Sequence, residues 1–312
     1  MARPVWAQER KAERVLRLGV LDPLPPAANA ANLEQLRKGL RAAGYSEGRN
    51  LAIEYRASEG RAARYPQLAE ELARLPVDVL LVRGTQAALG AKSVARELPI
   101  VALGVNDPVE TGLVASLERP GGNVTGIAFL IKDLETRRVD ALRALAPKTR
   151  RIAGLMNTGN PAIAHAWKML EEAARGFKLE ALLVDVRKRS QIEAAFDTAR
   201  AREADAAIVQ LGSLGMAQRQ TVVELAARHR LPAIYPSRQY VDAGGLVSYG
   251  VDASQLFYRA GVFVDRLAKG AKPAELAMEP PPKFELVINR KTLRSLDLVI
   301  PPDLLLRSNE IV

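Results

Sequence analysis

The chain has 312 residues, 48% of them hydrophobic, so it is long and apolar enough to bury substantial cores in two domains. It contains no cysteine, which excludes disulfides, thiolate metal sites and cysteine nucleophiles. The formal net charge is +10, but the basic residues are spread along polar helix faces, and the short basic run at 187–189 has no aromatic residues for base stacking. We therefore expect no nucleic-acid partner.

Membrane insertion and export leave different signals in a sequence. No apolar run reaches the roughly 18 residues that a transmembrane helix needs, so we expect no direct membrane insertion. Residues 5–7, VWA, followed by Gln8, resemble the small-x-small end of a secretory signal, although no apolar segment precedes them. On these residues alone, 1–14 is either a residual signal or an ordinary disordered tail.

Strand and helix patterns alternate from residue 15 onward. Strand-like runs at 15–21, 51–55, 77–82, 100–103 and 124–128 are separated by helical patterns at 29–43, 65–75 and 84–96. Another helix is expected to start at Asn106 or Asp107, because Pro108 suits the first helical position and Glu110 complements the helix dipole. This alternation indicates a mostly parallel, doubly wound α/β sheet.

The second half of the chain repeats this plan. The stretch DVLLVRG at 78–84 is followed by a helix and by ELPIV at 97–101, and DAAIVQLG at 205–212 is followed by a helix and by RLPAI at 230–234. Further strands are expected at 151–156, 179–184, 244–250 and 284–288, with helices at 133–145, 162–177, 191–202 and 254–269. We therefore predict two similar α/β lobes that present loops to a shared cleft.

Familiar catalytic motifs are missing from the sequence. The two histidines, His165 and His229, fall in separate helices without carboxylates at ligand spacing, so we expect no metal site. No P-loop, G-x-S-x-G or G-x-G-x-x-G motif follows a predicted strand. We expect neither an enzyme nor a bound cofactor.

Polar side chains stand where the predicted strands end, which is the sheet edge at which ligands bind in parallel α/β folds. They come from both halves of the chain: Thr85, Gln86, Asn106, Asp107, Asn157, Asn160, Ser213, Tyr235 and Ser237. Each one alone is better explained as a helix cap, but several at one edge favour a ligand site. Phe129, after the strand at 124–128, is either a core residue or a ring that stacks on the ligand.

Eight motifs occur in order along the chain and together carry a family resemblance. They are GLRAAGY at 39–45, NLAIEYR at 50–56, NDPV at 106–109, GLVASL at 112–117, RPGGNVTG at 119–126, LPAIY at 231–235, GGLVSYG at 244–250 and KFELVIN at 283–289. In this succession the chain resembles the ABC-transporter substrate-binding proteins related to tryptophan-binding receptors. The resemblance covers nearly the whole globular part.

The resemblance implies a type I periplasmic-binding-protein fold, with two lobes joined by a multi-segment hinge. The N-terminal lobe would comprise 15–127 plus 252–285 and the C-terminal lobe 128–251 plus 286–312, with crossings near 127–130, 250–254 and 285–289. The family's ligand-contacting loops match Asp22, Leu24, Gly84, Thr85, Gln86, Asn106, Asp107 and Asn157. The loop at 211–215 is less polar than in many relatives, which leaves the ligand open.

The function implied is that of the extracytoplasmic solute-binding component of an ABC importer. Export to the periplasm favours the signal interpretation of 1–14, and the protein would act as a monomer that delivers its ligand to a membrane permease. The ligand would be an amino acid, aromatic ones included, or a small aromatic or carboxylated metabolite. The alternatives are a ligand-sensing domain that works with a separate signalling partner, and an enzyme that lacks every familiar motif.

Overall fold

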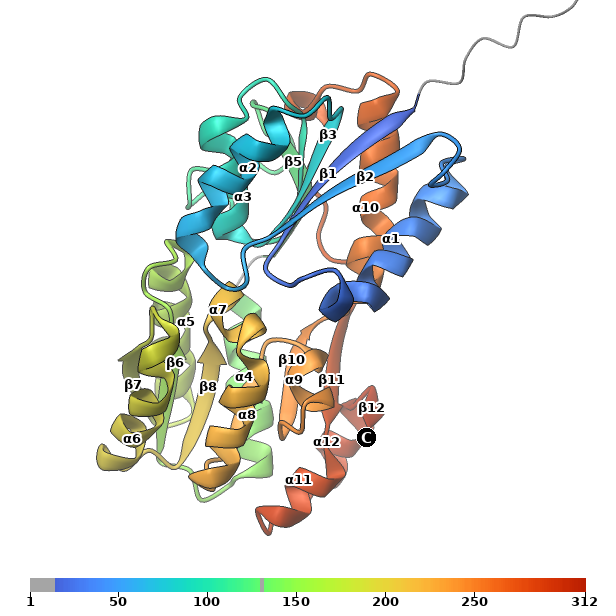
Figure 1. Ribbon diagram of the computed structural model, residues 1–312. Coiled ribbons are helices and arrows are strands. Elements are labelled where there is room, and N and C mark those ends of the chain that lie inside the picture. The colour runs from blue at the N-terminus through green and yellow to red at the C-terminus, as the bar shows by residue number, and fades with distance from the viewer. Residues whose placement is uncertain (1–14, 130–131) are drawn as a thin grey trace, which may run out of the picture.

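The computed structural model describes residues 15–129 and 132–312, and it divides their strands between two sheets (Figure 1). Each sheet has helices on both faces and forms its own α/β lobe. The predicted fold class, two doubly wound lobes, is confirmed. The tail predicted for residues 1–14 lies outside the described residues.

The first lobe is built on a five-stranded, all-parallel sheet in the order β2-β1-β3-β4-β5. Its strands are β1 (Leu16–Asp22), β2 (Leu51–Ala57), β3 (Val79–Arg83), β4 (Ile100–Asn106) and β5 (Val124–Phe129). One face packs against α2 (Tyr65–Ala73) and α3 (Thr85–Val94), and the other packs against α1 (Ala30–Ala42) and α10 (Ala253–Ala268). The near-continuous apolar strands are those of a sheet buried on both faces.

The second lobe is built on a seven-stranded sheet in the order β12-β11-β10-β9-β8-β6-β7, parallel except where β11 meets β10. Its strands are β6 (Arg151–Met156), β7 (Glu180–Asp185), β8 (Ala206–Gln210), β9 (Ala233–Tyr235), β10 (Val247–Val251), β11 (Phe284–Ile288) and β12 (Glu310–Ile311). One face carries α4 (Lys132–Leu145), α5 (Ala162–Gly176), α11 (Arg290–Ser295) and α12 (Pro302–Arg307). The other carries α6 (Ile192–Ala201), α7 (Gly212–Ala217), α8 (Arg219–Arg228) and α9 (Arg238–Asp242).

The two stretches that match in sequence occupy equivalent places in the two lobes. Strand β3 is followed by α3 and β8 by α7 and α8, and in each lobe the next strand, β4 or β9, follows a Leu-Pro pair and pairs beside them. Oδ2 of Asp78 accepts a 2.8 Å hydrogen bond from the amide of Arg17 in β1. Oδ2 of Asp205 likewise accepts a 3.0 Å bond from the amide of Arg151 in β6. The same carboxylate therefore ties together the equivalent strands in both lobes.

The helix expected at Asn106 or Asp107 does not form. Strand β4 continues through Gly104, which has φ +65°, and ends at Asn106 after a bulge between Leu103 and Val105. Asp107 then takes the left-handed region at φ +41°, and the single turn that follows is broken at Gly112, which has φ +68°. A helix cannot propagate through two left-handed residues, so the segment remains a series of turns.

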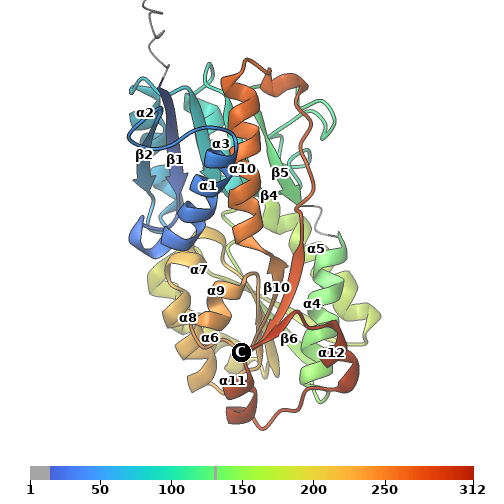
Figure 2. The same ribbon diagram turned by 90° about the vertical axis from the view of Figure 1, so that its right-hand side faces the viewer.

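The chain passes between the two sheets three times. The first passage runs from Phe129 to α4 and the second from β10 to α10, which Figure 2 shows rising into the first lobe. In the third, Glu279 still bonds the backbone of β5, and the chain then enters β11 at Phe284. This passage ends ahead of the expected stretch 285–289. The lobe boundaries at 127, 251 and 285 stay a prediction.

Candidate functional site

A cavity of about 200 Å³ lies between the lobes, at the carboxyl ends of strands from both sheets. Residues at or just after the ends of β3, β4, β5, β8, β9 and β10 form its walls, as the geometry of parallel sheets requires. Among the sequence-predicted site residues, it is lined by Gly84, Thr85, Gln86, Asn106, Phe129, Asn160, Ser213 and Ser237. The structure thus brings together polar loops from both halves of the chain.

Other predicted residues lie away from the cavity wall. Asn157 turns inward on its own loop, where its Oδ1 accepts a hydrogen bond from Gly159. Tyr235 is buried in the second lobe, stacked on Tyr240 with ring centroids 4.9 Å apart. Asp107 faces His165 of the other lobe, with 3.9 Å between its Oδ2 and the histidine Nε2. Contact of these side chains with a ligand stays a prediction.

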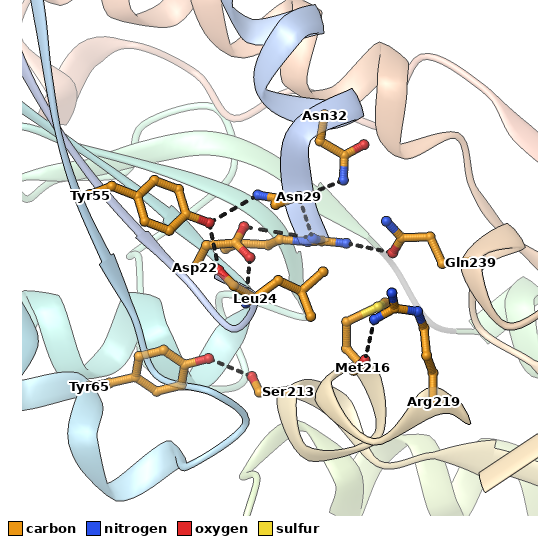
Figure 3. Close-up of polar contacts among 11 residues, drawn as sticks. Asp22, Leu24, Asn29, Asn32, Tyr55, Tyr65, Ser213, Met216, Arg219 and Gln239 are labelled. Atoms are coloured by element: carbon orange, nitrogen blue, oxygen red, sulfur yellow. Dashed lines mark hydrogen bonds and ion pairs between the residues drawn. The ribbon is translucent and has the colours of Figure 1, made fainter. Parts of the chain in front are cut away.

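Asp22 and Leu24, also predicted as site residues, support the wall from behind. Oδ1 of Asp22 accepts a 2.8 Å hydrogen bond from the amide of Leu24, and the carbonyl of Leu24 accepts a 2.7 Å bond from the Tyr55 hydroxyl. Figure 3 shows this cluster together with Asn29. Burial raises the pKa of Asp22 above its ordinary value, although the charge of Arg83 acts in the opposite direction. The cluster therefore fixes the loop after β1 and holds a carboxylate behind the wall.

Arg83, the last residue of β3, is the positive group that the first lobe presents to the cavity. Its Nη1 lies 3.6 Å from Oδ2 of Asp22, which ends the neighbouring strand β1, and its guanidinium lies 5.5 Å from the centre of the Phe257 ring. Its Nη2 reaches across the cleft to Oε1 of Gln239, at 3.4 Å. Because β1 and β3 end side by side, their terminal residues form this ion pair where ligands enter.

Glu135 and Arg138 form the charged part of the second lobe's wall. They lie one turn apart in α4, and Nη1 of Arg138 donates a 2.7 Å hydrogen bond to Oε1 of Glu135 while its Nε donates to the carbonyl of Tyr249. Glu135 has no exposed surface, and burial raises its pKa above the ordinary value, with Arg138 and then Gln210 opposing that rise. Its Oε2 accepts no hydrogen bond of normal geometry from the described residues.

Sequence reasoning missed Arg83, Glu135, Arg138 and Gln210 as wall residues. A signal was present in α4, because Glu135, Arg138, Val139 and Leu142 follow the i, i+3, i+4, i+7 spacing of a buried stripe. Charged residues on such a stripe indicate a buried pair rather than a solvated face. Arg83 also carried a signal, because it is the single charged residue of β3 and stands at the end of that strand.

A few polar contacts join the lobes around the cavity. The Tyr65 hydroxyl donates a 2.7 Å hydrogen bond to Oγ of Ser213, as Figure 3 shows. Nε2 of Gln86 donates a 3.4 Å bond to the carbonyl of Gly159. With the Arg83–Gln239 contact, these bonds hold the lobes in a closed arrangement over the cavity.

Few of the described residues that line the cavity carry a charge. Their charged groups on the cavity wall are Arg83, Glu135 and Arg138, and the rest of the wall is polar or apolar. Within the same residues no three His, Asp and Glu side chains gather as metal ligands would. Along the described stretches, none of the helices combines the length and apolar character that crossing a membrane requires.

Comparison with known proteins bears on the whole chain. The family model for ABC transporter substrate binding protein matches residues 18–312. A tyrosine-binding protein of Clostridioides difficile (strain R20291) is 26% identical over 271 residues, which cover 86% of this chain and 78% of the relative. A solved ABC domain in complex with L-Trp from Streptococcus pneumonia has a TM-score of 0.87 at 24% identity, and a conserved domain protein from Vibrio cholerae has one of 0.88 at 25% identity. Each comparison covers 96% of this chain and 100% of the other. The chain belongs to the family of ABC transporter substrate-binding proteins.

Proposed function

We propose that this chain is the periplasmic solute-binding component of an ABC importer, that it works as a monomer with a membrane permease, and that its cavity encloses one small ligand. Its family consists of substrate-binding proteins, so it is a binding protein and not an enzyme. The observation that carries the proposal is the cavity between the lobes, whose wall is built from strand-end loops of both sheets.

The ligand we propose is an amino acid, aromatic ones included, or a small aromatic or carboxylated metabolite. The wall combines charged groups of both signs with apolar side chains, and the apolar part comprises Leu103, Phe129, Leu134, Ile163, Met216, Val251, Leu256 and Phe257. The charged main-chain groups of an amino acid would contact the charged part of the wall, and an apolar side chain of the ligand would contact the apolar part. Two relatives bind amino acids according to their names, tyrosine in one and L-Trp in the other.

Transport would depend on closure of the lobes. A ligand that contacts both walls favours the closed arrangement, because only there are both sets of contacts made. The bonds from Tyr65 to Ser213 and from Gln86 to Gly159 exist only when the lobes are close together. A permease that recognises the closed form would then receive loaded protein in preference to empty protein.

A thermal-shift screen of amino acids, aromatic acids and nucleosides tests the proposed ligand class. A ligand that binds only the folded protein, at a hundred times its Kd, adds about 2.7 kcal/mol to the free energy of unfolding, which raises Tm measurably. We expect at least one amino acid or aromatic acid to raise Tm and no nucleoside to do so. Failure of every amino acid and carboxylate to shift Tm would overturn the proposal.

Two single variants test the site itself. Thr85 lines the cavity, and its Oγ1 accepts a 3.0 Å hydrogen bond from the amide of Asn106, while Asp107 faces His165 of the other lobe. We expect Thr85→Ala and Asp107→Ala to weaken binding in calorimetry without unfolding the empty protein. Thr198→Ala, which changes an exposed threonine of α6, is the matched control. Unchanged affinity in both site variants would contradict the assignment.

A further inference from the structure

The short helix α7 lies at the edge of the second lobe that faces the first (Figure 1). Gly212, Ser213 and Met216 of this helix line the cavity, whereas Leu214 and Ala217 lie outside the cavity wall. Glycine, alanine and apolar residues make up most of the helix, so it offers few polar groups to a ligand. The helix is therefore available for a contact of another kind.

The part of the first lobe that meets α7 is the turn at 58–61, directly after β2. Gly60 in this turn has a left-handed φ of +77°, which glycine adopts without strain. The amide of Arg61 donates a 3.0 Å hydrogen bond to the carbonyl of Ser58, and the amide of Ser58 donates one of 3.0 Å to the carbonyl of Asp22 at the end of β1. These bonds fix the turn to its own sheet, so it moves with the first lobe.

Gly60 packs directly on α7. It is buried, although Glu59 before it is exposed. A Cβ on Gly60 would lie 2.7 Å from Cβ of Ala217, which is closer than two carbon atoms pack in proteins. It would also lie 3.1 Å from the carbonyl oxygen of Ser213 and 3.3 Å from Cα of Leu214. The backbone of the turn therefore fits against the helix because residue 60 has no side chain.

Both surfaces of this contact are held firmly by their own lobes. In the second lobe, Leu214 belongs to the buried core, and a Cβ on Gly215 would lie 2.6 Å from the hydroxyl oxygen of Tyr240. In the first lobe, Tyr65 follows the turn, is fully buried, and donates its 2.7 Å hydrogen bond to Oγ of Ser213 beside the contact. Extra volume at the contact must therefore be accommodated by moving the lobes apart.

Resting on the proposed function, we propose that Gly60 and Ala217 are positioning residues for closure. The contact between the turn at 58–61 and α7 sets how closely the lobes approach, and so how tightly any ligand is enclosed. Neither residue lines the cavity, so both act on a ligand only through the positions of the lobes. This gives the weakly polar helix α7 a role that does not depend on the chemistry of the ligand.

The proposal predicts a loss of affinity that is the same for every ligand. When only a fraction of the molecules can adopt the binding-competent form, the apparent Kd of each ligand is its intrinsic Kd divided by that fraction. A larger side chain at the contact lowers that fraction and leaves the cavity wall unchanged. In calorimetry we expect Ala217→Leu to weaken L-tyrosine, L-tryptophan and any other compound that raises Tm in the screen by one common factor of about ten. Ala227→Leu, which changes an exposed alanine of α8, is the matched control and should leave affinity unchanged.

A rescue experiment distinguishes this role from a general structural one. Gly60→Ala places a Cβ against that of Ala217 and should weaken binding. Gly48→Ala is its control, because Gly48 has φ +82° and a Cβ there would meet nothing within 4 Å. Both variants strain the backbone in the same way, so their Tm values should fall alike. Adding Ala217→Gly to Gly60→Ala removes the opposing Cβ and should restore part of the affinity, while the loss of Tm remains.

Disulfide trapping tests the contact without a ligand. The chain has no cysteine, so a disulfide within the double variant Gly60→Cys, Ala217→Cys must join the two lobes. Disulfides need Cβ atoms about 3.5–4.5 Å apart, which the lobes reach just before their full approach. We expect oxidation with diamide to form this disulfide, detected by mass spectrometry of the digested protein. The pair Gly48→Cys, Ala227→Cys is the control and should form none within one chain.

The outcomes separate this proposal from the proposed function. Absence of the disulfide between positions 60 and 217 in the folded protein overturns the contact, whichever ligand binds. Unchanged affinity in Ala217→Leu, or losses that differ between two ligands, overturn it as well, because the effect would then not come from closure. So does a failure of Ala217→Gly to restore affinity in Gly60→Ala. If the disulfide forms but no compound in the screen binds the wild-type protein, the proposed function fails and the contact that limits closure stands.

Discussion

Packing inside each lobe and contact between the lobes are of different kinds. In the first lobe, α1 lies beside α10 (Figure 2). The two helices are so close that a Cβ on Gly39 would overlap the carbonyl oxygen of Tyr258, and one on Gly261 would lie 2.6 Å from the Gly39 carbonyl carbon. Between the lobes the polar contacts are single bonds such as Tyr65 to Ser213. Tight packing makes each lobe a rigid body, and isolated bonds let the lobes separate.

The buried pair inside the second lobe should give the largest effect. Arg138→Met removes the partner of Glu135 and the bond to the Tyr249 carbonyl, leaving a carboxylate that has no exposed surface without its counter-charge. Breaking a buried pair on one side costs roughly 3–5 kcal/mol. We expect a loss of unfolding free energy near the lower end of that range at pH 7.5, measured by urea denaturation.

The same variant has a pH signature. The folded-state pKa of Glu135 is raised above its ordinary value of 4.5, so between those two pKa values the folded state binds more protons than the unfolded state, and stability falls as pH rises. Removing Arg138 raises that pKa further, so the deficit should be largest at neutral pH and shrink as pH falls through the folded pKa. The double variant Glu135→Gln, Arg138→Met should recover most of the loss. A deficit that is independent of pH would contradict this account.

The crossing of α1 and α10 should give the second largest effect. Gly39→Ala forces apart two helix backbones, and overpacking of this kind costs about 1–3 kcal/mol. Gly176→Ala is the matched control, since it changes a helical glycine in α5 whose added Cβ would meet nothing within 4 Å. We expect Tm to fall by several degrees in the first variant and to hold or rise slightly in the second. Equal Tm values in the two variants would show that the helices can move apart freely.

The two α/β lobes could be predicted from the sequence because the strand and helix patterns are local and occur in both halves of the chain. Alternating strand and helix patterns predict the two parallel sheets. The strand order then places loops such as 84–86 and 212–213 at the cavity, so their position can be predicted without knowing any side-chain contact. The helix predicted to start at Asn106 or Asp107 does not form, and the reason is the backbone conformation. The left-handed φ angles at Asp107 and Gly112 depend on how β4 ends, which propensity does not report.

The charged wall was harder to predict from the sequence. The spacing of α4 places Glu135 and Arg138 on its buried stripe, but the groups that they contact there depend on how α4 packs on β10. Tyr65 and Ser213 are 148 residues apart, so their contact depends on the relative placement of the lobes. Sequence patterns specify which face of an element is buried more readily than which partner it meets.

The bond between Tyr65 and Ser213 should have a moderate effect that is confined to closure. Tyr65→Phe keeps the ring that packs in the first lobe and removes one hydrogen bond, worth about 1 kcal/mol. We expect affinity for the ligand to fall about fivefold, in line with that energy, with little change in the Tm of the empty protein. A double-mutant cycle with Ser213→Ala measures the pair itself, and a coupling energy near zero would show that the bond does not contribute to closure.

The smallest effect is expected for the long contact between the lobes in which Nε2 of His165 in α5 lies 3.9 Å from Oδ2 of Asp107. The distance is long, and the His165 side chain is 37% exposed, so water and salt weaken the interaction. We expect His165→Gln to change ligand affinity less than about twofold in calorimetry, as exposed pairs generally do. His229→Gln, whose histidine faces Asp197 at 3.5 Å inside the second lobe, is the control that does not touch the cleft. A tenfold loss of affinity in His165→Gln alone would mean that this single contact contributes strongly to closure. The contrast between tightly packed lobes and weak bonds between them would then no longer hold.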